Sequence, residues 1–124
     1  MDTFIVTWPD WTALRSLQAT LALRRKLSEA AVVRPEAVPP DVVTMNSRFL
    51  CHADDPRDAR VVTLCFPSEA FRRPGRLSIS TPVGTAVLGA CTGQTVVLQQ
   101  RTFRIGDVLY QPERVRYSPL PVAP

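Results

Sequence analysis

The hydrophobic positions of the first thirty residues follow a helical repeat that is interrupted once. Thr7-Trp8-Pro9-Asp10 has the features of a helix start: a hydroxyl cap, a proline in the first turn and an acid three residues on. The apolar positions that follow form two stripes, Trp11, Leu14, Leu17 and Leu21, and then Leu23, Leu27 and Ala31. The stripes are out of phase, since Leu23 follows Leu21 too closely for one helical face. We therefore predict a short strand or an extended lead-in at residues 4–6. Two short helices that turn near residues 18–20 are expected to follow, with one bent helix as the alternative.

After residue 42 the apolar positions alternate with polar ones, as in strands. The preceding segment, residues 33–41, holds three prolines and predicts a stiff connector. One strand phase consists of Val43, Met45, Phe49 and Cys51, and the returning phase of Val62, Leu64 and Phe66. Residues 54–56, Asp-Asp-Pro, predict the turn between them. Residues 92–93 open a later strand that contains Val96 and Leu98.

The most informative stretch of the chain is residues 75–93. Leu77 and Ile79 alternate with serines, which predicts a strand that buries one face. Thr81 can cap the free amides of a helix that begins at Pro82, and Gly89 can take the left-handed conformation that ends it. A strand is thus expected to deliver the chain into a rigid, proline-led helical turn at the surface.

The last strand has a break in its alternation. Phe103 and Ile105 share one phase, whereas Val108 and Tyr110 share the other. A hairpin turn at residues 106–107 or a bulge at Gly106 would each explain the change. Residues 113–124 contain three prolines and little periodicity, which predicts a loose tail.

Composition narrows the picture to one soluble domain. The chain of 124 residues has 45% hydrophobic and 21% charged residues, no long apolar run and no visible signal peptide, so we expect a cytoplasmic protein. Its formal net charge is +4, because fourteen arginines and one lysine outnumber eleven acidic residues. The basic residues are too scattered for a nucleic-acid footprint. Three separated cysteines, Cys51, Cys65 and Cys91, predict buried thiols rather than a metal site, with a redox switch as the minor alternative.

Three separated motifs resemble a known family. Residues 39–47, Pro-Pro-Asp-Val-Val-Thr-Met-Asn-Ser, resemble the opening of the globular domain of the bacterial regulators of nucleoside diphosphate kinase. Residues 80–89, Ser-Thr-Pro-Val-Gly-Thr-Ala-Val-Leu-Gly, are similar to the signature that these proteins share with the Gre transcript elongation factors. Residues 110–113, Tyr-Gln-Pro-Glu, resemble the end of that domain. The resemblance covers residues 38–113 in order, and the N-terminal part shares only the helical pattern.

The resemblance implies an α+β fold: a strongly curved antiparallel sheet with a short helix, of the FK506-binding-protein-like type. The implied organisation is a short helical hairpin over residues 1–34 (a truncated coiled-coil arm), a Gre-type C-terminal domain over residues 35–113 and a flexible tail over residues 114–124. It also implies one bulged strand at Gly106, with the hairpin turn near residues 99–101.

The resemblance further implies RNA polymerase as the partner, bound at the rim of its secondary channel. By motif match, Thr81, Pro82 and Val83, with Ser80 beside them, would make the contact, although the same residues could simply start a helix. Four basic residues of the arm, Arg15, Arg24, Arg25 and Lys26, are candidate contacts with acidic polymerase surface or RNA, or else form a solvated face. Any nucleic-acid contact is expected to be weak or indirect.

Cleavage-stimulating Gre factors carry acidic residues at the arm tip that help to hold magnesium, whereas residues 16–20 here contain no carboxylate. A helix of about ten residues also extends only about 15 Å. We therefore expect no transcript cleavage, no metal and no cofactor. A protein that occupies the rim without acting would exclude Gre factors by competition.

The resemblance also suggests two other functions. The family name suggests direct control of nucleoside diphosphate kinase, but no glycine-rich phosphate loop is present. FK506-binding relatives include prolyl isomerases, but fold alone does not carry function, and the aromatic residues at strand positions are better explained as core. These residues are Phe49, Phe66, Phe103 and Tyr110. The lone His52 suggests no nucleophile–base pair, so we expect a protein that is not an enzyme.

Overall fold

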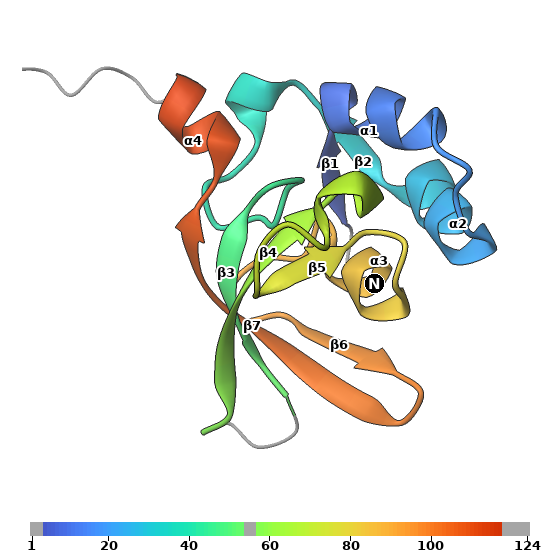
Figure 1. Cartoon of the computed structure of the whole chain (residues 1–124). Coiled ribbons are helices and arrows are strands. Elements are labelled where there is room, and N and C mark those ends of the chain that lie inside the picture. Colours follow the sequence, from blue (N-terminus) through green and yellow to red (C-terminus); the bar gives the residue numbers. More distant parts are fainter. Residues whose placement is uncertain (1–3, 54–56, 118–124) are drawn as a thin grey trace, which may run out of the picture.

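A curled five-stranded sheet forms the body of the protein in the computed structural model, which describes residues 4–53 and 57–117 (Figure 1). The spatial order of its strands is β5-β4-β3-β7-β6. Their bounds are β3 Arg48–His52, β4 Ala59–Cys65, β5 Arg76–Ser78, β6 Thr95–Leu98 and β7 Arg101–Tyr110. The predicted turn at residues 54–56 lies outside the described residues, but β3 and β4 pair antiparallel on either side of it, as the alternation predicted.

The α+β fold class with a curved sheet is confirmed, and the sheet is antiparallel except at one edge. Strand β5 pairs parallel with β4, with Leu77 opposite Leu64. A parallel neighbour needs a crossover connection instead of a tight turn. Residues 66–75 make that connection and contain a short 3-10 helix at Pro67–Glu69. As a result, the C-terminal ends of β4 and β5 lie at the same end of the sheet.

Strand β7 is one continuous, bulged strand, which resolves the break in alternation at Gly106. Its register against β3 shifts between the Phe49–Val108 and Cys51–Ile105 pairs. A Cβ atom at position 106 would lie 2.8 Å from the Cβ of Leu50, so glycine permits this close approach. The preceding hairpin turns at Gln99 and Gln100, both with positive φ, where the family resemblance implied it.

The expectation of a strand from residue 42 is wrong, because β3 begins only at Arg48. Residues 44–47 form a tight turn in which the Ser47 hydroxyl accepts a hydrogen bond from the Thr44 amide at 2.8 Å. Asn46 takes a positive φ of 68° in that turn, which asparagine tolerates better than most residues. Val43 and Met45 are nevertheless buried, so their hydrophobicity reflects a packed loop.

Two short helices and a small parallel strand pair precede the body. Helix α1, Trp8–Arg15, and helix α2, Leu21–Glu29, confirm the prediction of two helices rather than one bent helix. Thr7 caps α1 as predicted, and Thr20 caps α2. Strand β1, Ile5–Thr7, pairs parallel with β2, Ala31–Val33. The two ends of the helical hairpin therefore lie side by side. We call residues 7–30 the arm.

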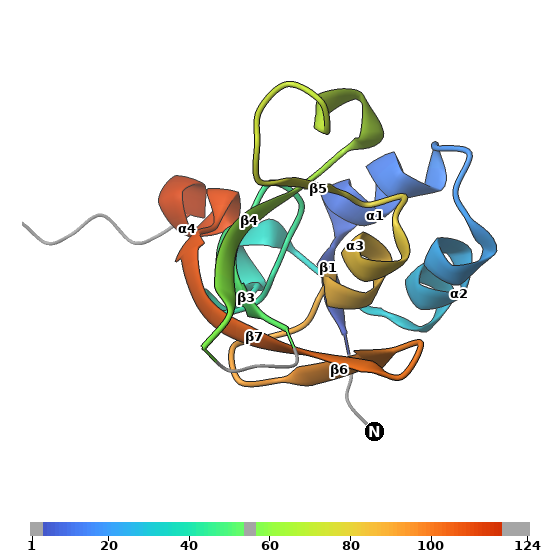
Figure 2. The ribbon, with the colours of Figure 1, turned by 60° about the horizontal axis from the view of Figure 1, so that its bottom comes forward.

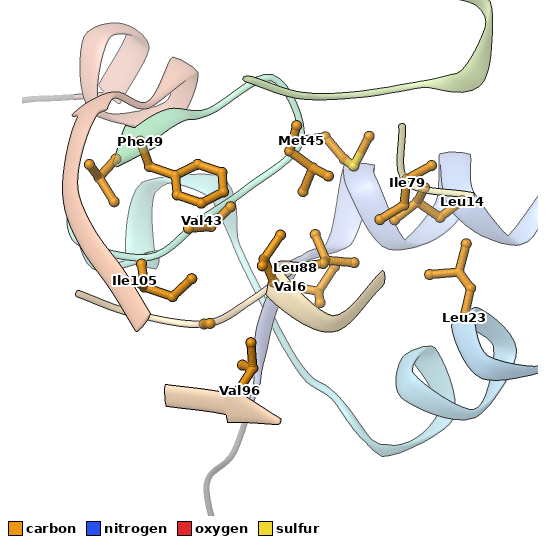
Figure 3. Packing of buried hydrophobic residues seen from close by; sticks show 14 of the residues in the cluster. Val6, Leu14, Leu23, Val43, Met45, Phe49, Ile79, Leu88, Val96 and Ile105 are labelled. Atoms are coloured by element: carbon orange, nitrogen blue, oxygen red, sulfur yellow. The ribbon is translucent and has the colours of Figure 1, made fainter. Parts of the chain in front are cut away.

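The arm and the body share one hydrophobic core (Figure 3). Leu14 and Leu23 from the arm are fully buried in the same cluster as Phe49 and Ile105 from the sheet. Helix α3, Pro82–Val87, lies beside α2 in both views of the ribbon (Figure 2). The arm is therefore packed onto the body and does not project from it.

The expected loose tail is replaced by a helix as far as the structure describes it. Helix α4, Pro112–Tyr117, follows β7 directly, and the remaining tail residues lie outside the described part. Its Glu113 carboxylate accepts a hydrogen bond from the Thr44 hydroxyl at 2.6 Å. Arg114 donates to the carbonyl oxygens of Pro40 and Val108 at 3.0 Å each. These contacts tie α4 to the connector before β3, which itself contains a 3-10 helix at Pro35–Ala37.

Candidate functional site

The proline-led turn predicted from the sequence lies at the end of β5 and is held by its own hydrogen bonds. We call residues 80–83 the corner. The Thr81 hydroxyl accepts from the amide of Gly84 at 3.0 Å, which caps α3, and donates to the carbonyl of Ser78 at 2.7 Å. The Ser78 and Ser80 hydroxyls lie 2.8 Å apart. The conformation of the corner is thus fixed by hydrogen bonds within the chain.

A close approach between α3 and β5 fixes the corner further. The backbone of Gly84 lies so near to Ser78 that a Cβ atom there would collide with the Ser78 carbonyl. On the next turn, the Thr85 hydroxyl donates to the carbonyl of Ile79 at 2.8 Å. Gly89 then ends the segment with a φ of 81°, as predicted. These contacts allow α3 little freedom to move relative to the strand.

The four corner residues differ in what they present to solvent. Ser80 and Pro82 are exposed, whereas Thr81 and Val83 are half-buried and Val83 packs against the core. The corner therefore offers a hydroxyl and a proline ring on a stiff backbone. Such a surface is small and not concave, and it suits contact with another macromolecule better than enclosure of a small ligand.

The four basic residues expected to act together on the arm are divided by the structure. Arg15, Arg24 and Arg25 are exposed. The guanidinium of Arg15 lies 4.5 Å from the centre of the Trp11 ring, and the Trp11 Nε1 donates to the carbonyl of Leu27 at 3.0 Å, which joins the two helices. Trp11, Arg15, Arg24, Leu27 and Ser28 line a groove of about 420 Å³ between the helices.

Lys26, the fourth of these residues, turns away from solvent and into the body. Its Nζ donates to the carbonyls of Thr85 and Ala86, both at 2.7 Å, in the last turn of α3. The same nitrogen lies 3.8 Å from the centre of the Phe4 ring. Burial lowers the pKa of Lys26 to about 7. Lys26 therefore joins the arm to the far end of the corner helix and is not part of a solvated basic face.

An exposed aromatic residue that the sequence analysis did not single out is Phe71, in the crossover between β4 and β5. Its side chain is 97% exposed. Arg72 and Arg73 follow it, and Arg72 pairs with Glu69 at 3.6 Å. The exposure of Phe71 could have been predicted from the sequence, because this residue lies outside every strand phase and close to the turn residues Pro74 and Gly75.

Of the aromatic residues predicted as core, the sheet residues Phe49 and Phe103 are buried and Phe66 packs against the cluster. The prediction is wrong for Tyr110, which is 42% exposed at the end of β7. Trp11 joins the two helices through its hydrogen bond to the carbonyl of Leu27, whereas Trp8 is largely exposed.

Burial changes the acidity of two of the three cysteine thiols. Burial raises the pKa of the Cys51 and Cys65 thiols, which disfavours the nucleophilic thiolate. Within residues 4–53 and 57–117, no three His, Cys, Asp or Glu side chains are grouped so that they could hold a metal ion. No helix of this part of the chain is long and apolar enough to cross a bilayer.

One carboxyl group links the arm to the body. The Asp10 carboxylate accepts a hydrogen bond from the Met45 amide at 3.1 Å. Burial raises the pKa of Asp10 to about 6; the Met45 amide opposes this shift and the negative charge of Glu113 adds to it. Both acids line a cleft of about 200 Å³ between α1 and α4. The Asp10 carboxyl group has a structural role, since its hydrogen bond holds the start of α1 against the loop before β3.

Together these features define a small α+β domain with a curled sheet, a capped corner helix and a short helical arm. A family model described as "Transcription elongation factor, GreA/GreB, C-term" matches residues 38–110, which is more than half of the chain. The chain belongs to this GreA/GreB C-terminal domain family.

Known relatives agree with this assignment. The chain is 39% identical over 75 residues to the "Regulator of nucleoside diphosphate kinase" of Escherichia coli (strain K12), a match that covers 60% of this chain and 55% of the relative. It is 32% identical over 90 residues to the "Transcription elongation factor GreA" of Azorhizobium caulinodans, covering 69% of this chain and 57% of that protein. The matches therefore span little more than half the length of these relatives, which are named as regulators or transcription factors and not as enzymes.

A solved structure shares the fold over nearly the whole chain. It is the "Prokaryotic transcription elongation factor GreA/GreB from Nitrosomonas europaea", with a TM-score of 0.72 and 28% sequence identity. The match covers 89% of this chain and 100% of that one. It supports the resemblance that the three sequence motifs indicated.

Proposed function

We propose that this protein is a non-enzymatic bacterial transcription regulator that binds RNA polymerase at the rim of the secondary channel through the corner, residues 80–83. The observation that carries the proposal is the pre-formed corner, in which exposed Pro82 follows the capping residue Thr81 and begins a helix that is packed closely on β5. Membership of the GreA/GreB family supports the choice of partner. Such a protein would act in the cytoplasm, where polymerase is found.

The corner is physically suited to binding because little freedom remains to be lost. Pro82 fixes its own φ, and the Thr81 hydroxyl holds both the strand end and the helix start. Ordering flexible side chains and loops at an interface costs about 0.5–1.5 kcal/mol per group, so a surface ordered in advance binds more tightly for the same contact area.

We further propose that the protein stimulates no transcript cleavage. The turn between the helices, residues 16–20, contains no carboxylate that could hold magnesium. Helices α1 and α2 have 8 and 9 residues and extend about 12–14 Å, and they pack on the body. Binding without cleavage would make the protein a competitor of Gre factors for one site on polymerase.

The test is co-migration with purified bacterial RNA polymerase, with wild type and Pro82→Ala compared. We expect the wild type to co-migrate, Pro82→Ala to bind about tenfold more weakly, which is the order of effect for a contact residue at an interface, and excess GreA to displace the wild type. Pro74→Ala is the matched control, because Pro74 is also exposed but precedes β5, at the opposite end from the corner. Equal binding by the two variants would contradict a contact through the corner.

The arm cations form a separate part of the proposal. Arg24 and Arg25 are exposed on α2 and could meet acidic polymerase surface or RNA, as could Arg15 on α1. Replacing Arg24 and Arg25 by glutamate should weaken polymerase binding and reduce its salt dependence. Unchanged binding at low salt would show that these arginines are only a solvated face.

A second candidate function rests on one observation, the name of the E. coli relative, "Regulator of nucleoside diphosphate kinase". In this alternative the protein binds the kinase directly and acts on nucleotide metabolism. Binding to purified kinase with polymerase absent would support it. Binding to polymerase alone would leave any effect on the kinase indirect, through transcription.

A further inference from the structure

The chain has fourteen arginines and a single lysine, and that lysine occupies a position that joins two surface elements. Lys26 extends from α2 of the arm to the C-terminal turn of α3, the helix whose first turn is the corner. A helix of six residues spans about 9 Å, so the lysine contact and the corner lie at the two ends of one short, stiff element.

The two carbonyls that Lys26 contacts lack their usual helical partners. The amide of Gly89, which would normally donate to the Thr85 carbonyl, donates instead to Val43 at 2.8 Å. The amide of Ala90, the expected donor for Ala86, donates instead to Val87 at 3.1 Å. The ammonium of Lys26 supplies both missing donors at the negative end of the helix dipole.

Lysine fits this place better than arginine would. A compact ammonium with rotatable donors can meet two neighbouring carbonyls and the Phe4 ring at once, whereas a planar guanidinium is broader. Helix α3 carries no charged side chain, and burial is the physical cause that lowers the pKa of Lys26. Among the described residues, the Lys26 nitrogen is thus held by carbonyl oxygens and an aromatic face.

We propose that Lys26 is a positioning residue that fixes the arm to the corner helix, so that arm and corner meet one partner as a single rigid surface. This inference rests on the proposed function, since the partner is the one bound by the corner. Lys26 itself does not touch the partner, because its nitrogen is occupied by Thr85, Ala86 and Phe4. It acts through α3.

The first test needs no partner. Lys26→Met removes the donors and keeps the side-chain length, Lys26→Arg keeps the charge, and Arg25→Met is the matched control on the same helix, because Arg25 is exposed. We expect amide hydrogen exchange at Thr85 and Leu88 to be about tenfold faster in Lys26→Met, partly restored in Lys26→Arg and unchanged in Arg25→Met. Wild-type exchange rates in Lys26→Met would overturn the proposal.

The second test uses a double-mutant cycle for binding to RNA polymerase, at a temperature where all variants are folded. Lys26→Met should weaken binding about tenfold, and Pro82→Ala combined with Lys26→Met should be no weaker than Pro82→Ala alone, because both changes act through the corner. Additive losses, or full binding by Lys26→Met while Pro82→Ala is impaired, would refute the positioning role and leave the proposed function intact. If the wild type does not bind polymerase, the proposed function fails, and the role in partner binding fails with it whatever the exchange data show.

Discussion

The corner and the arm are both held firmly, but by contacts of opposite kinds. The hydrogen bonds of the corner join residues close in sequence, such as Thr81 with Ser78 and Thr85 with Ile79. The polar contacts that attach the arm to the body join distant residues, Asp10 with Met45 and Lys26 with Thr85. The corner is therefore a local structure, whereas the arm depends on the completed fold.

This difference indicates how far the structure of each region depends on the rest of the protein. The hydrogen bonds that shape the corner itself are local, whereas the far end of its helix also depends on the contact of Lys26 with Thr85 and Ala86. The arm has only two short helices, and isolated helices of this length are marginal in water. Its shape follows from burial of Leu14, Leu23 and Leu27 in the common core. We therefore expect the arm and body to unfold together.

The largest predicted effect concerns this shared core. Leu14→Ala should lower the free energy of unfolding by about 3 kcal/mol, because Leu14 is fully buried and leaves a cavity. Urea unfolding should remain a single transition when followed by both circular dichroism and tryptophan fluorescence. Leu21→Ala, at a residue 59% exposed on the same arm, should cost far less. Two separate transitions would show that the arm is an independent unit.

The next effect concerns the local structure of the corner. Gly84→Ala should lower the free energy of unfolding by about 2 kcal/mol, because the added methyl group meets the Ser78 carbonyl and forces α3 away from β5. Gly93→Ala adds the same group where nothing lies within 4 Å but φ is 90°, so it isolates the backbone strain, which we expect to cost about 1 kcal/mol. Urea titration of both variants gives the comparison. A smaller loss for Gly84→Ala than for Gly93→Ala would contradict the close packing of α3 on β5.

A smaller effect tests the arm through pH. The pKa of Asp10 is raised from 3.8 to about 6 in the folded protein, so the folded state binds the proton more tightly than the unfolded chain. Stability from this group is fully present below about pH 4 and is lost as the pH rises through 6. Relative to Asp10→Asn, the wild type should therefore lose on the order of 1 kcal/mol between pH 4 and 7, after allowance for screening. Parallel pH profiles of the two proteins would show that Asp10 is well solvated.

The sequence predicted the local features of the fold well. Thr7, Thr81 and Gly89 have the expected capping roles because such signals act within a few residues. Strands were also correctly predicted around Val62 and Leu77, but burial does not alternate along them: Leu64 and Cys65 are both buried, and Ser78 is buried whereas Leu77 is only half-buried. The corner, which is the candidate site, is a feature of this kind.

The contacts between distant segments could not be predicted from the sequence. Nothing in the sequence pattern shows that β1 pairs with β2, that Lys26 reaches α3 or that Glu113 meets Thr44. The basic cluster at residues 24–26 looked uniform, yet the fold buries one of its members and exposes two. Such features depend on where the completed chain brings its segments together.

Contact between the corner and RNA polymerase can be tested with a photo-activated cross-linker placed on the protein. Ser80→p-benzoylphenylalanine puts the probe on an exposed corner position, and Pro74→p-benzoylphenylalanine puts it beyond the other end of β5. Binding through the corner predicts cross-links to polymerase from position 80 that excess GreA abolishes, and few from position 74. Cross-links from position 74 with none from position 80, or none from either, would contradict binding through the corner.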